Sequence, residues 1–496
     1  MTTPGVFDFD ALECAAAAPA SAPPLEFEHG PCAPPPASAL RAAAAPSILR
    51  ASLNVEASAL TERMRDELTL VPKTADDRKP QPYEAFTVQG AVAQVPRYWG
   101  LGVFGGGRCT VRTSRGEAAP ALRFGATLRP YQVAAVGHVV RALTDPATAA
   151  HGAMLVAGCG CGKTVMALAI AARLGRKTAV LCHNSMLIEQ WRERIAQFFG
   201  AGSADPVVGV VQREQVEVEP PIVCFMIASV VSGRYDAECA AVFDRFGLVV
   251  VDECHHIAAK TFMQSLRRFP ADARLGLTAT PERRDGLGHA VEWMLGPVVY
   301  RVKRVTQEVE VRVLAHERGA ATELKRYGKP DYTRMVTRTV DDVARTDALA
   351  SLARRLVDEG RHVIVLSDRR AHLEALHARL GAELSGVYAG ETTKKGKRER
   401  ETSLAKRVML ATTKMGEEGL DVPILSALVL ATPKSGLGGI EQAVGRILRK
   451  CAAKTHHPLI VDVVDPANIF RGMARKRERY YREQGFRVVH GPLEPA

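Results

Sequence analysis

Short, nearly continuous Val/Ile/Leu runs, each followed by a stretch with helical periodicity, constrain the fold of this chain more than any other feature. A first series of such runs falls at residues 153–157, 178–182, 222–227, 247–251, 274–278 and 298–302, and a second at 362–366, 384–388, 407–411, 427–431 and 459–463. Runs of this kind are typical of parallel strands that helices cover on both faces. The sequence therefore predicts an α/β fold with two tandem parallel-sheet domains, at 126–303 and 342–488, joined by a charged linker at 304–341.

The segments outside these two series have a different composition. Residues 1–50 are rich in Ala and Pro and are predicted to be a disordered tail. Residues 55–125 contain strand-like pieces broken by Gly and Pro, which predict a small accessory domain. Near the C-terminus a basic helix is expected at about 467–484, with Tyr480 and Tyr481 interleaved among Lys and Arg.

Charge and cysteine usage limit the class of protein. The 496-residue chain carries a net charge of +12, which fits either a phosphate-rich partner or solubilising surface charge. Its ten cysteines include no C-x-x-C pair, so we expect reduced thiols in an intracellular compartment, either cytoplasm, nucleus or a virion. The run Cys254-His255-His256 lacks a second ligand pair at zinc-site spacing. The longest apolar run, Val422–Thr432, is too short to span a bilayer, so no membrane partner is expected.

Residues 157–164, AGCGCGKT, form a glycine-rich turn between a predicted strand and a predicted helix. Such a turn directs backbone N–H groups and the helix dipole toward one point, where anions bind. Gly158, Gly160 and Gly162 would let the backbone curl around phosphates, Lys163 would reach the β and γ phosphates, and Thr164 would ligate Mg²⁺. Ala157 stands where the usual phosphate-loop pattern has its first glycine. The alternative is a tight corner with an incidental lysine.

Two carboxylates follow the apolar run at 247–251, and we expect them beside the phosphate loop because ligands bind at the carboxyl ends of parallel strands. Asp252 would hold the metal, and Glu253 would deprotonate the water that attacks the γ-phosphate. In the second domain, Arg446 and Arg449 are three residues apart and are expected on one helical face, from which they could reach a γ-phosphate. The alternatives are a strand end with two solvated acids and a solvated basic helix.

Six motifs occur in a fixed order: LRPYQ (128–132), AGCGCGKT (157–164), DECH (252–255), LTATP (277–281), ATTKMGEEGLDVP (411–423) and EQAVGRILR (441–449). This set resembles superfamily 2 helicases of the DExH type. With SDRR (367–370) and ATPKSGLGGIEQAVGRILRK (431–450), it is similar to helicases of large DNA viruses and to XPB-like and UvsW-type DNA helicases. The resemblance covers about Leu128 to Gly485 and implies two RecA-like domains, a helicase ATP-binding domain and a helicase C-terminal domain.

The resemblance also implies roles for residues that the local patterns do not assign. Gln132, supported by Arg129, would read the adenine, Gly419 and Asp421 would meet the ribose, and Gln442 would lie at the cleft. His255, Thr278 and Thr280 would couple hydrolysis to domain closure. The catalytic set would be Glu253, Asp252, Lys163, Arg446 and Arg449. A nucleic-acid strand would pass near His183, Asn184, Ser229, Ser367, Arg369, Arg370, Thr412 and Thr413.

Together these features predict a monomeric, ATP- and Mg²⁺-dependent helicase or translocase that acts on DNA in preference to RNA, with 3′ to 5′ polarity, in viral transcription, repair or recombination. Transcription or repair proteins are the expected protein partners. Two other functions remain open from the sequence. One is a translocase that removes proteins or transcripts without separating strands, and the other is a catalytically silent nucleic-acid-binding scaffold.

Overall fold

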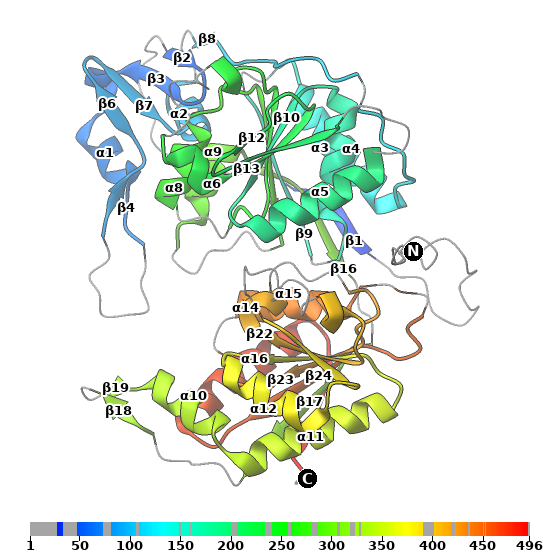
Figure 1. Ribbon diagram of the computed structural model, residues 1–496. Helices are drawn as coiled ribbons and strands as arrows, with labels where there is room; N and C mark the ends of the chain where they lie inside the picture. The colour runs from blue at the N-terminus through cyan, green and yellow to red at the C-terminus, as the bar shows by residue number, and fades with distance from the viewer. Residues whose placement is uncertain are drawn as a thin grey trace. The chain divides into compact units, whose positions relative to one another are not determined.

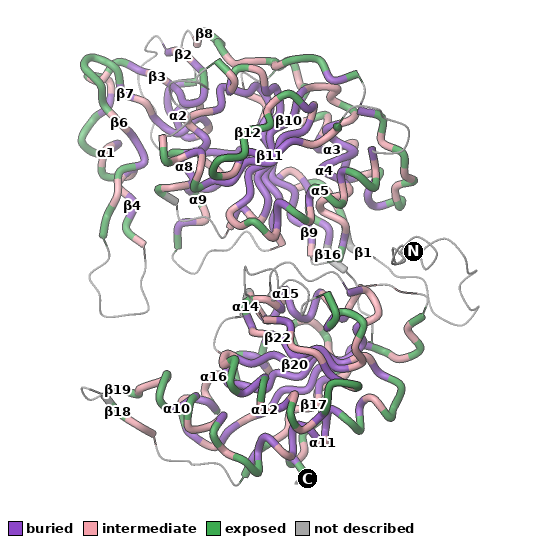
Figure 2. Tube along the Cα trace, viewed as in Figure 1, coloured by how far each residue is buried: buried purple, intermediate pink, exposed green. Residues whose placement is uncertain are grey.

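The chain folds into two compact units, Phe27–Lys303 and a second that begins at Arg304. The computed structural model describes residues 27–32, 47–72, 81–105, 109–120, 122–147, 150–158, 160–199, 206–233, 241–255, 259–279, 286–304, 308–317, 323–326, 329–389, 401–417, 422–434, 437–449, 451 and 453–494. Each unit contains one large, mainly parallel sheet whose strands are buried (Figures 1 and 2). The predicted fold class, two RecA-like α/β domains in tandem, is confirmed.

The first unit is organised around a nine-stranded sheet of order β1-β16-β9-β15-β14-β10-β13-β11-β12. Its strands are β1 (Phe27–Pro31), β9 (His151–Ala157), β10 (Thr178–Cys182), β11 (Val208–Gln212), β12 (Gln215–Val216), β13 (Ile222–Met226), β14 (Leu248–Val251), β15 (Ala273–Thr278) and β16 (Val298–Arg304). From β16 to β11 every neighbouring pair is parallel. All six apolar runs of the first series form strands, whereas β1, β11 and β12 were not expected.

Helices cover both faces of this sheet (Figure 1). On one face lie α3 (Pro130–Thr144), α4 (Lys163–Leu174) and α5 (Ser185–Phe199), which share a core with one set of strand side chains. On the other lie α6 (Ile227–Val231), α8 (Ala259–Leu266) and α9 (Gly288–Leu295). Covered on both faces, the strands have no polar side to alternate with, which explains their continuous apolar runs.

An N-terminal module precedes the large sheet and packs on it. It contains a five-stranded sheet, β6 (Thr87–Gln89), β7 (Val92–Val95), β3 (Leu53–Glu56), β2 (Ser47–Leu49) and β8 (Cys109–Val111), with a pair β4 (Thr69–Leu70) and β5 (Tyr83–Glu84), the 3₁₀ turn η2 (Ala57–Ala59), α1 (Glu62–Leu68) and α2 (Arg97–Phe104). Its apolar residues share one core with α6, α8 and α9. β1 and β2 lie inside residues 1–50, so the predicted boundary of the disordered tail does not match the structure.

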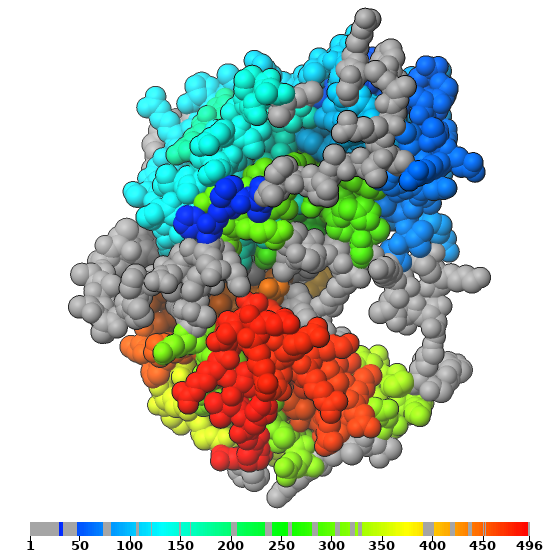
Figure 3. All heavy atoms as spheres, turned by 180° about the vertical axis from the view of Figure 1, so that it is seen from behind, coloured from blue at the N-terminus to red at the C-terminus, as the bar shows by residue number. Residues whose placement is uncertain are grey.

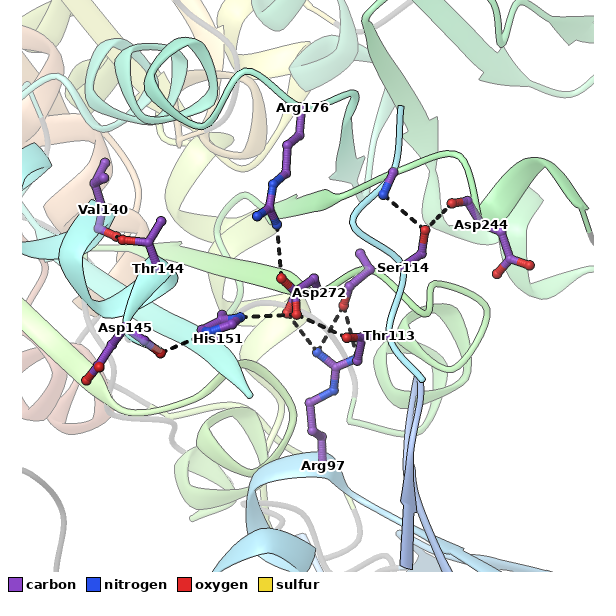
Figure 4. Close-up of polar contacts among 12 residues, drawn as sticks. Arg97, Thr113, Ser114, Val140, Thr144, Asp145, His151, Arg176, Asp244 and Asp272 are labelled. Carbon is purple, nitrogen blue, oxygen red and sulfur yellow. Dashed lines mark hydrogen bonds and ion pairs between the residues drawn. The ribbon is translucent and has the colours of Figure 1, made fainter. Parts of the chain in front are cut away.

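Buried polar contacts fasten this module to the amino-terminal edge of the large sheet (Figure 4). Arg97 of α2 is fully buried and donates to the carbonyl oxygens of Ala271 and Asp272 at 3.0 and 3.2 Å. The Asp272 carboxylate accepts hydrogen bonds from Thr113 and Arg176, each at 3.0 Å. Since Asp272 precedes β15, this junction lies at the opposite edge of the sheet from the end of β9.

The second unit has a seven-stranded parallel sheet of order β21-β22-β20-β23-β24-β17-β25. Its strands are β17 (Glu310–Ala315), β20 (Val363–Ser367), β21 (Ser385–Tyr388), β22 (Val408–Thr412), β23 (Ala427–Leu430), β24 (Leu459–Val464) and β25 (Arg487–Pro492). The five runs of the second series all form strands. β17 belongs to the stretch expected to be a linker, which also contains the hairpin β18 (Lys325–Arg326) and β19 (Lys329–Pro330) and the helix α10 (Tyr332–Val340).

Two helix layers cover this sheet. α11 (Val343–Asp358) and α12 (Arg370–Leu380) pack on one face. On the other face lie α14 (Thr413–Glu417), α15 (Leu437–Ile447) and α16 (Asn468–Glu483). α16 is the basic helix expected from the sequence, but Tyr480 and Tyr481 are 8% and 0% exposed and pack in the core. The two tyrosines that alternate with Lys and Arg in the sequence therefore do not lie with them on the exposed side of the helix.

A buried histidine in the second unit predicts a pH-dependent stability. His372 of α12 is 1% exposed and lies 3.0 Å, Nδ1 to Oγ, from Ser367. Burial, together with the charges of Arg345 and Arg379, lowers the pKa of His372 to about 3. Below a pH of about 6.5 the unfolded chain binds a proton on this histidine, whereas the folded chain does not. The contribution of His372 to the free energy of unfolding is therefore fully present above that pH and falls as the pH is lowered toward 3.

Because of this histidine alone, the free energy of opening should fall by about 2 kcal/mol when the pH is lowered from 7 to 5. The His372→Gln variant should not show this fall. The check is native-state hydrogen exchange of β20 and α12 at both pH values, corrected for intrinsic exchange. An equal pH dependence in wild type and variant would contradict the assignment.

The cysteines whose state the structure describes, Cys32, Cys109, Cys161, Cys182, Cys224, Cys254 and Cys451, form no disulfide. Among helices in the described ranges, none combines the length and apolar character needed to cross a bilayer.

Candidate nucleotide-binding site

Three chain segments with candidate site residues converge at the carboxyl edge of the first sheet. The phosphate loop, residues 157–164, follows β9, Thr278 ends β15, and Asp252 follows β14. β15 lies between β9 and β14 and is parallel to both. The loop and the acidic pair therefore follow strands that are two strand spacings apart, about 10 Å.

The phosphate loop curls tightly before α4. Gly160 and Gly162 both have φ of +78°, a left-handed conformation that residues with a Cβ rarely adopt. The Cys161 N–H donates to the Gly158 carbonyl at 3.2 Å, and α4 begins at Lys163. This curl places the loop at the helix amino terminus, where unpaired N–H groups and the helix dipole favour an anion. Cys159 lies outside the described residues.

Gly162 has no room for a side chain. A Cβ there would lie 2.5 Å from Nε2 of Gln132 in addition to the strain of its positive φ. Gly162→Ala should therefore displace Gln132 and lower ATP affinity by roughly tenfold or more, because leaving one buried hydrogen-bonding group unsatisfied costs about 1–3 kcal/mol. Titration with a fluorescent ATP analogue measures this.

The matched control is Gly175→Ala, because Gly175 ends the same helix with φ of +59° and no atom within 4 Å of an added Cβ. Equal affinity losses in both variants would show that strain and not the Gln132 contact is responsible.

Lys163 and Glu253 bridge the gap between the loop and the acidic pair. Nζ of Lys163 lies 3.3 Å from Oε1 of Glu253 and donates to the Ala157 carbonyl at 3.3 Å. The two side chains are only 10% and 16% exposed. Glu253 has φ of +45°, an uncommon value for a residue with a side chain. Backbone strain of this kind collects at functional sites, where surrounding contacts maintain it.

Asp252 is buried beside Glu253 and held by two hydrogen bonds. Oδ2 accepts from Nε1 of Trp191 at 2.8 Å, and Oδ1 accepts from the Glu253 N–H at 2.9 Å. Burial and then the neighbouring Glu253 charge raise the pKa of Asp252 to about 6, while Lys163 opposes the shift. Trp191 of α5 is a site residue that the motifs did not indicate.

His255 and Thr278 connect the acidic pair to β15. Nδ1 of His255 lies 2.7 Å from the Thr278 hydroxyl and 3.5 Å from Oε2 of Glu253. The Cys254 N–H donates to the Leu277 carbonyl at 3.1 Å, which ties the two segments together. A movement at Glu253 would therefore be transmitted to β15. Thr280 lies outside the described residues.

Gln132 lies against the phosphate loop at the start of α3. Its Oε1 accepts from the Arg129 N–H at 2.9 Å, and its Nε2 donates to the Cys161 carbonyl at 3.3 Å. Tyr131, which belongs to the LRPYQ motif but to which the sequence assigns no role, donates its hydroxyl to the same carbonyl at 3.1 Å. An amide side chain has two donor hydrogens and two acceptor lone pairs, so Gln132 retains capacity for a base edge.

The second-unit candidates lie on α15 and just after it. Gln442 is 8% exposed, and Arg446 is half-buried in the last turn. Arg449 lies beyond the last helical residue, Ile447, with its N–H bonded to the Arg446 carbonyl at 3.4 Å. The expectation that the two arginines share one helical face is therefore wrong, because the helix ends between them. Gly419 and Asp421 lie outside the described residues.

The residues expected along a nucleic-acid strand divide into exposed and buried groups. Ser367 is 0% exposed and bonded to His372, and Thr413 is 6% exposed, so neither can contact a strand in this conformation. His183, Asn184, Ser229, Arg369, Arg370 and Thr412 are half-buried or exposed.

The donor set at the edge of the first sheet fits Mg²⁺ with a nucleotide. Thr164 stands in the first turn of α4 and offers a hydroxyl, and Asp252 offers a carboxylate. Hydroxyl, carboxylate, water and phosphate oxygens are the ligands that Mg²⁺ prefers. No group of three or more His, Cys, Asp or Glu side chains within the described ranges could hold a metal by itself, and His256 lies outside them.

Two family descriptions match the chain, "Type III restriction enzyme, res subunit" at residues 125–283 and "Helicase conserved C-terminal domain" at residues 345–451. The chain is 26% identical over 450 residues to "Putative ATP-dependent RNA helicase L396" of Acanthamoeba polyphaga mimivirus, covering 86% of this chain and 82% of the relative. It is 27% identical over 335 residues to "Probable helicase D10" of Escherichia phage T5, covering 66% and 71%.

Among solved structures, a fragment of an HsdR subunit of a type I restriction enzyme from Vibrio vulnificus YJ016 matches with a TM-score of 0.53 and 19% identity, covering 76% of this chain and 72% of that one. This likeness supports the fold of two RecA-like domains.

Proposed function

Because the chain belongs to the superfamily 2 helicases, we propose that it couples ATP hydrolysis at the phosphate loop to movement along a nucleic acid. The observation that supports this most directly is the ion pair between Lys163 and Glu253, at 3.3 Å, across the carboxyl edge of the first sheet. This ion pair brings together, in one buried site, the Lys163 ammonium, which can bind a phosphate, and the Glu253 carboxylate, which can accept a proton from water.

The ion pair also indicates how the site responds to its substrate. A triphosphate bound at the amino terminus of α4 competes with Glu253 for Lys163, since phosphate oxygens are strong acceptors. Glu253 is then released to orient a water molecule and take its proton. His255 lies 3.5 Å from Glu253 and contacts Thr278, so a movement of Glu253 would shift His255 and, through it, Thr278.

Thr164 and Asp252 would hold Mg²⁺, which supplies positive charge that neutralises the β and γ phosphates. Trp191 fixes the position of the Asp252 carboxylate through its 2.8 Å hydrogen bond. Gln132, oriented by the Arg129 N–H, would select adenine over other bases.

From the second unit, Gln442, Arg446 and Arg449 would close over the triphosphate, and Gly419 and Asp421 would meet the ribose. Guanidinium groups that contact the γ-phosphate stabilise the charge of the transition state. Binding of ATP would thus hold the two units together, and hydrolysis would release them. Repeated closure moves a strand that contacts both units.

We propose DNA as the substrate, with 3′ to 5′ polarity, in viral transcription, repair or recombination. The net charge of +12 supports a phosphate-rich partner. The mimivirus relative is named as an RNA helicase, so the decisive assay must compare both nucleic acids.

The test measures ATPase and strand displacement on 3′-tailed, 5′-tailed and forked DNA beside the equivalent RNAs. We expect DNA-stimulated ATPase and displacement from 3′-tailed DNA. Displacement only from RNA, or only from 5′-tailed DNA, would overturn the assigned substrate or polarity. Removal of a bound protein without strand separation would identify a translocase, and absence of stimulated ATPase would contradict the motor.

A further inference from the structure

The outer face of α16 carries a row of arginines that the proposed motor does not use. Arg471, Arg475, Arg479 and Arg482 are all exposed and recur at spacings of three and four residues, which places them on one side of the helix. We refer to these four residues as the α16 basic stripe. It extends for about 16 Å along the helix, and the C-terminal residues coloured red lie openly on the face seen in Figure 3.

The charge on the buried side of α16 is neutralised, and this side is packed against neighbouring elements. Arg477 is 1% exposed, and its guanidinium forms two hydrogen bonds, both 2.7 Å, with the Asp462 carboxylate of β24. Tyr481 donates its hydroxyl to the same carboxylate at 3.0 Å. Phe470 packs edge-on against Tyr332 of α10 with ring centroids 6.3 Å apart. The helix is therefore held at both ends, and the stripe is presented in a fixed orientation.

The charge of the stripe is only partly offset. Glu483 lies 3.5 Å from Arg479, and Glu478 contacts both Arg482 and His490. Arg479 and Arg482 remain 77% and 67% exposed, and ion pairs at such exposed positions contribute little. Arg471 has no acidic residue three or four positions away on the helix. The stripe thus retains positive charge over its full length.

The chemistry of this face favours a phosphate backbone without access to bases. Sites for single strands combine positive charge with aromatic side chains on which bases stack. α16, described over its whole length, exposes no aromatic side chain, because Phe470, Tyr480 and Tyr481 are all buried. A helix with a row of four arginines matches the regular phosphates of a duplex, about five of which lie along 16 Å of one strand.

We propose that the α16 basic stripe is a second nucleic-acid site, which binds the backbone of a double-stranded segment independently of sequence. This rests on the proposed function, since a motor that works on a strand meets duplex next to it. By holding that duplex, the stripe would keep the second unit on its track while the first unit exchanges nucleotide.

The test compares Arg471→Ala with Arg475→Ala, as a double variant of the full chain, against Arg354→Ala with Arg355→Ala. The control pair is exposed on α11, which covers the opposite face of the same sheet. Affinity for a blunt DNA duplex, a blunt RNA duplex and a single-stranded oligonucleotide is measured by fluorescence anisotropy over a range of salt concentrations. ATPase without nucleic acid and the melting temperature report whether each variant is folded.

For duplex DNA we expect the slope of log K against log salt to become shallower by about 1.8 in the α16 variant, from two lost phosphate contacts, and to stay unchanged in the control. Single-strand binding and basal ATPase should be unchanged in both. If the slope of log K against log salt for duplex DNA were the same in the two variants, the inference would be overturned. The α16 basic stripe would then be assigned to an acidic protein partner. An equal loss on the single strand would overturn the assignment to duplex. A wild type that binds duplex here but shows no nucleic-acid-stimulated ATPase in the strand-displacement test above would contradict the proposed function alone.

Discussion

Glu253→Gln should lower the nucleic-acid-stimulated ATPase rate by about 10² to 10⁴-fold, the range that a positioned general base contributes. The amide has nearly the same shape as the carboxylate, so the loop after β14 should keep its conformation. It cannot accept a proton from water, however, and it no longer forms the ion pair with Lys163. ATP binding should therefore be retained or strengthened while turnover is lost.

The measurement is steady-state ATPase beside the affinity for a fluorescent ATP analogue. Glu193→Gln is the control, because Glu193 is an exposed acid on α5 in the same unit. Retention of more than a tenth of wild-type turnover in Glu253→Gln would show that another group takes the proton.

Arg446→Ala should have a larger effect than Glu253→Gln. We expect turnover to fall by about 10³ to 10⁵-fold, because the Arg446 guanidinium is proposed to stabilise the transferring phosphoryl group. The nucleotide is gripped by the first unit, so ATP binding should change far less than turnover. Arg446→Lys should not restore activity, because a lysine ammonium lacks the planar fork that contacts two phosphate oxygens.

Arg355→Ala, which removes an exposed arginine from α11 of the same unit, is the control and should leave turnover unchanged. A parallel fall in ATP affinity and turnover in Arg446→Ala would indicate a ground-state binding role. Turnover at the wild-type rate in Arg446→Ala would show that Arg446 does not act at the nucleotide-binding site.

Much of the fold was predictable because its strands are covered on both faces. The runs that became β9, β10, β13, β14 and β15 contain almost no polar residues, so burial could be read directly from them. β17 was missed because charged residues, Glu310 and Arg312, alternate with valines and give the pattern of a connector. Its place between β24 and β25 depends on pairing across more than a hundred residues, which no local pattern reports.

The candidate site was predictable where one short segment carries the chemistry, as in Lys163 and the adjacent Asp252 and Glu253. Trp191 and Tyr131 were missed because their hydrogen bonds to the site depend on how separate helices pack. The burial of the α16 tyrosines could not be predicted for a similar reason. Arg477 stands in a basic stretch of the sequence, but its pairing with Asp462 turns that side of the helix, with Tyr481, toward the core.

The central claim is that a triphosphate gripped by the phosphate loop is closed over by arginines of the second unit. A crystal structure with ADP, beryllium fluoride, Mg²⁺ and a nucleic-acid strand tests it most directly. We predict the Arg446 guanidinium within hydrogen-bonding distance, about 2.7–3.2 Å, of the fluorides that represent the γ-phosphate, with Lys163 withdrawn from Glu253. Arg446 directed away from that group, with the Lys163–Glu253 ion pair intact, would contradict the account.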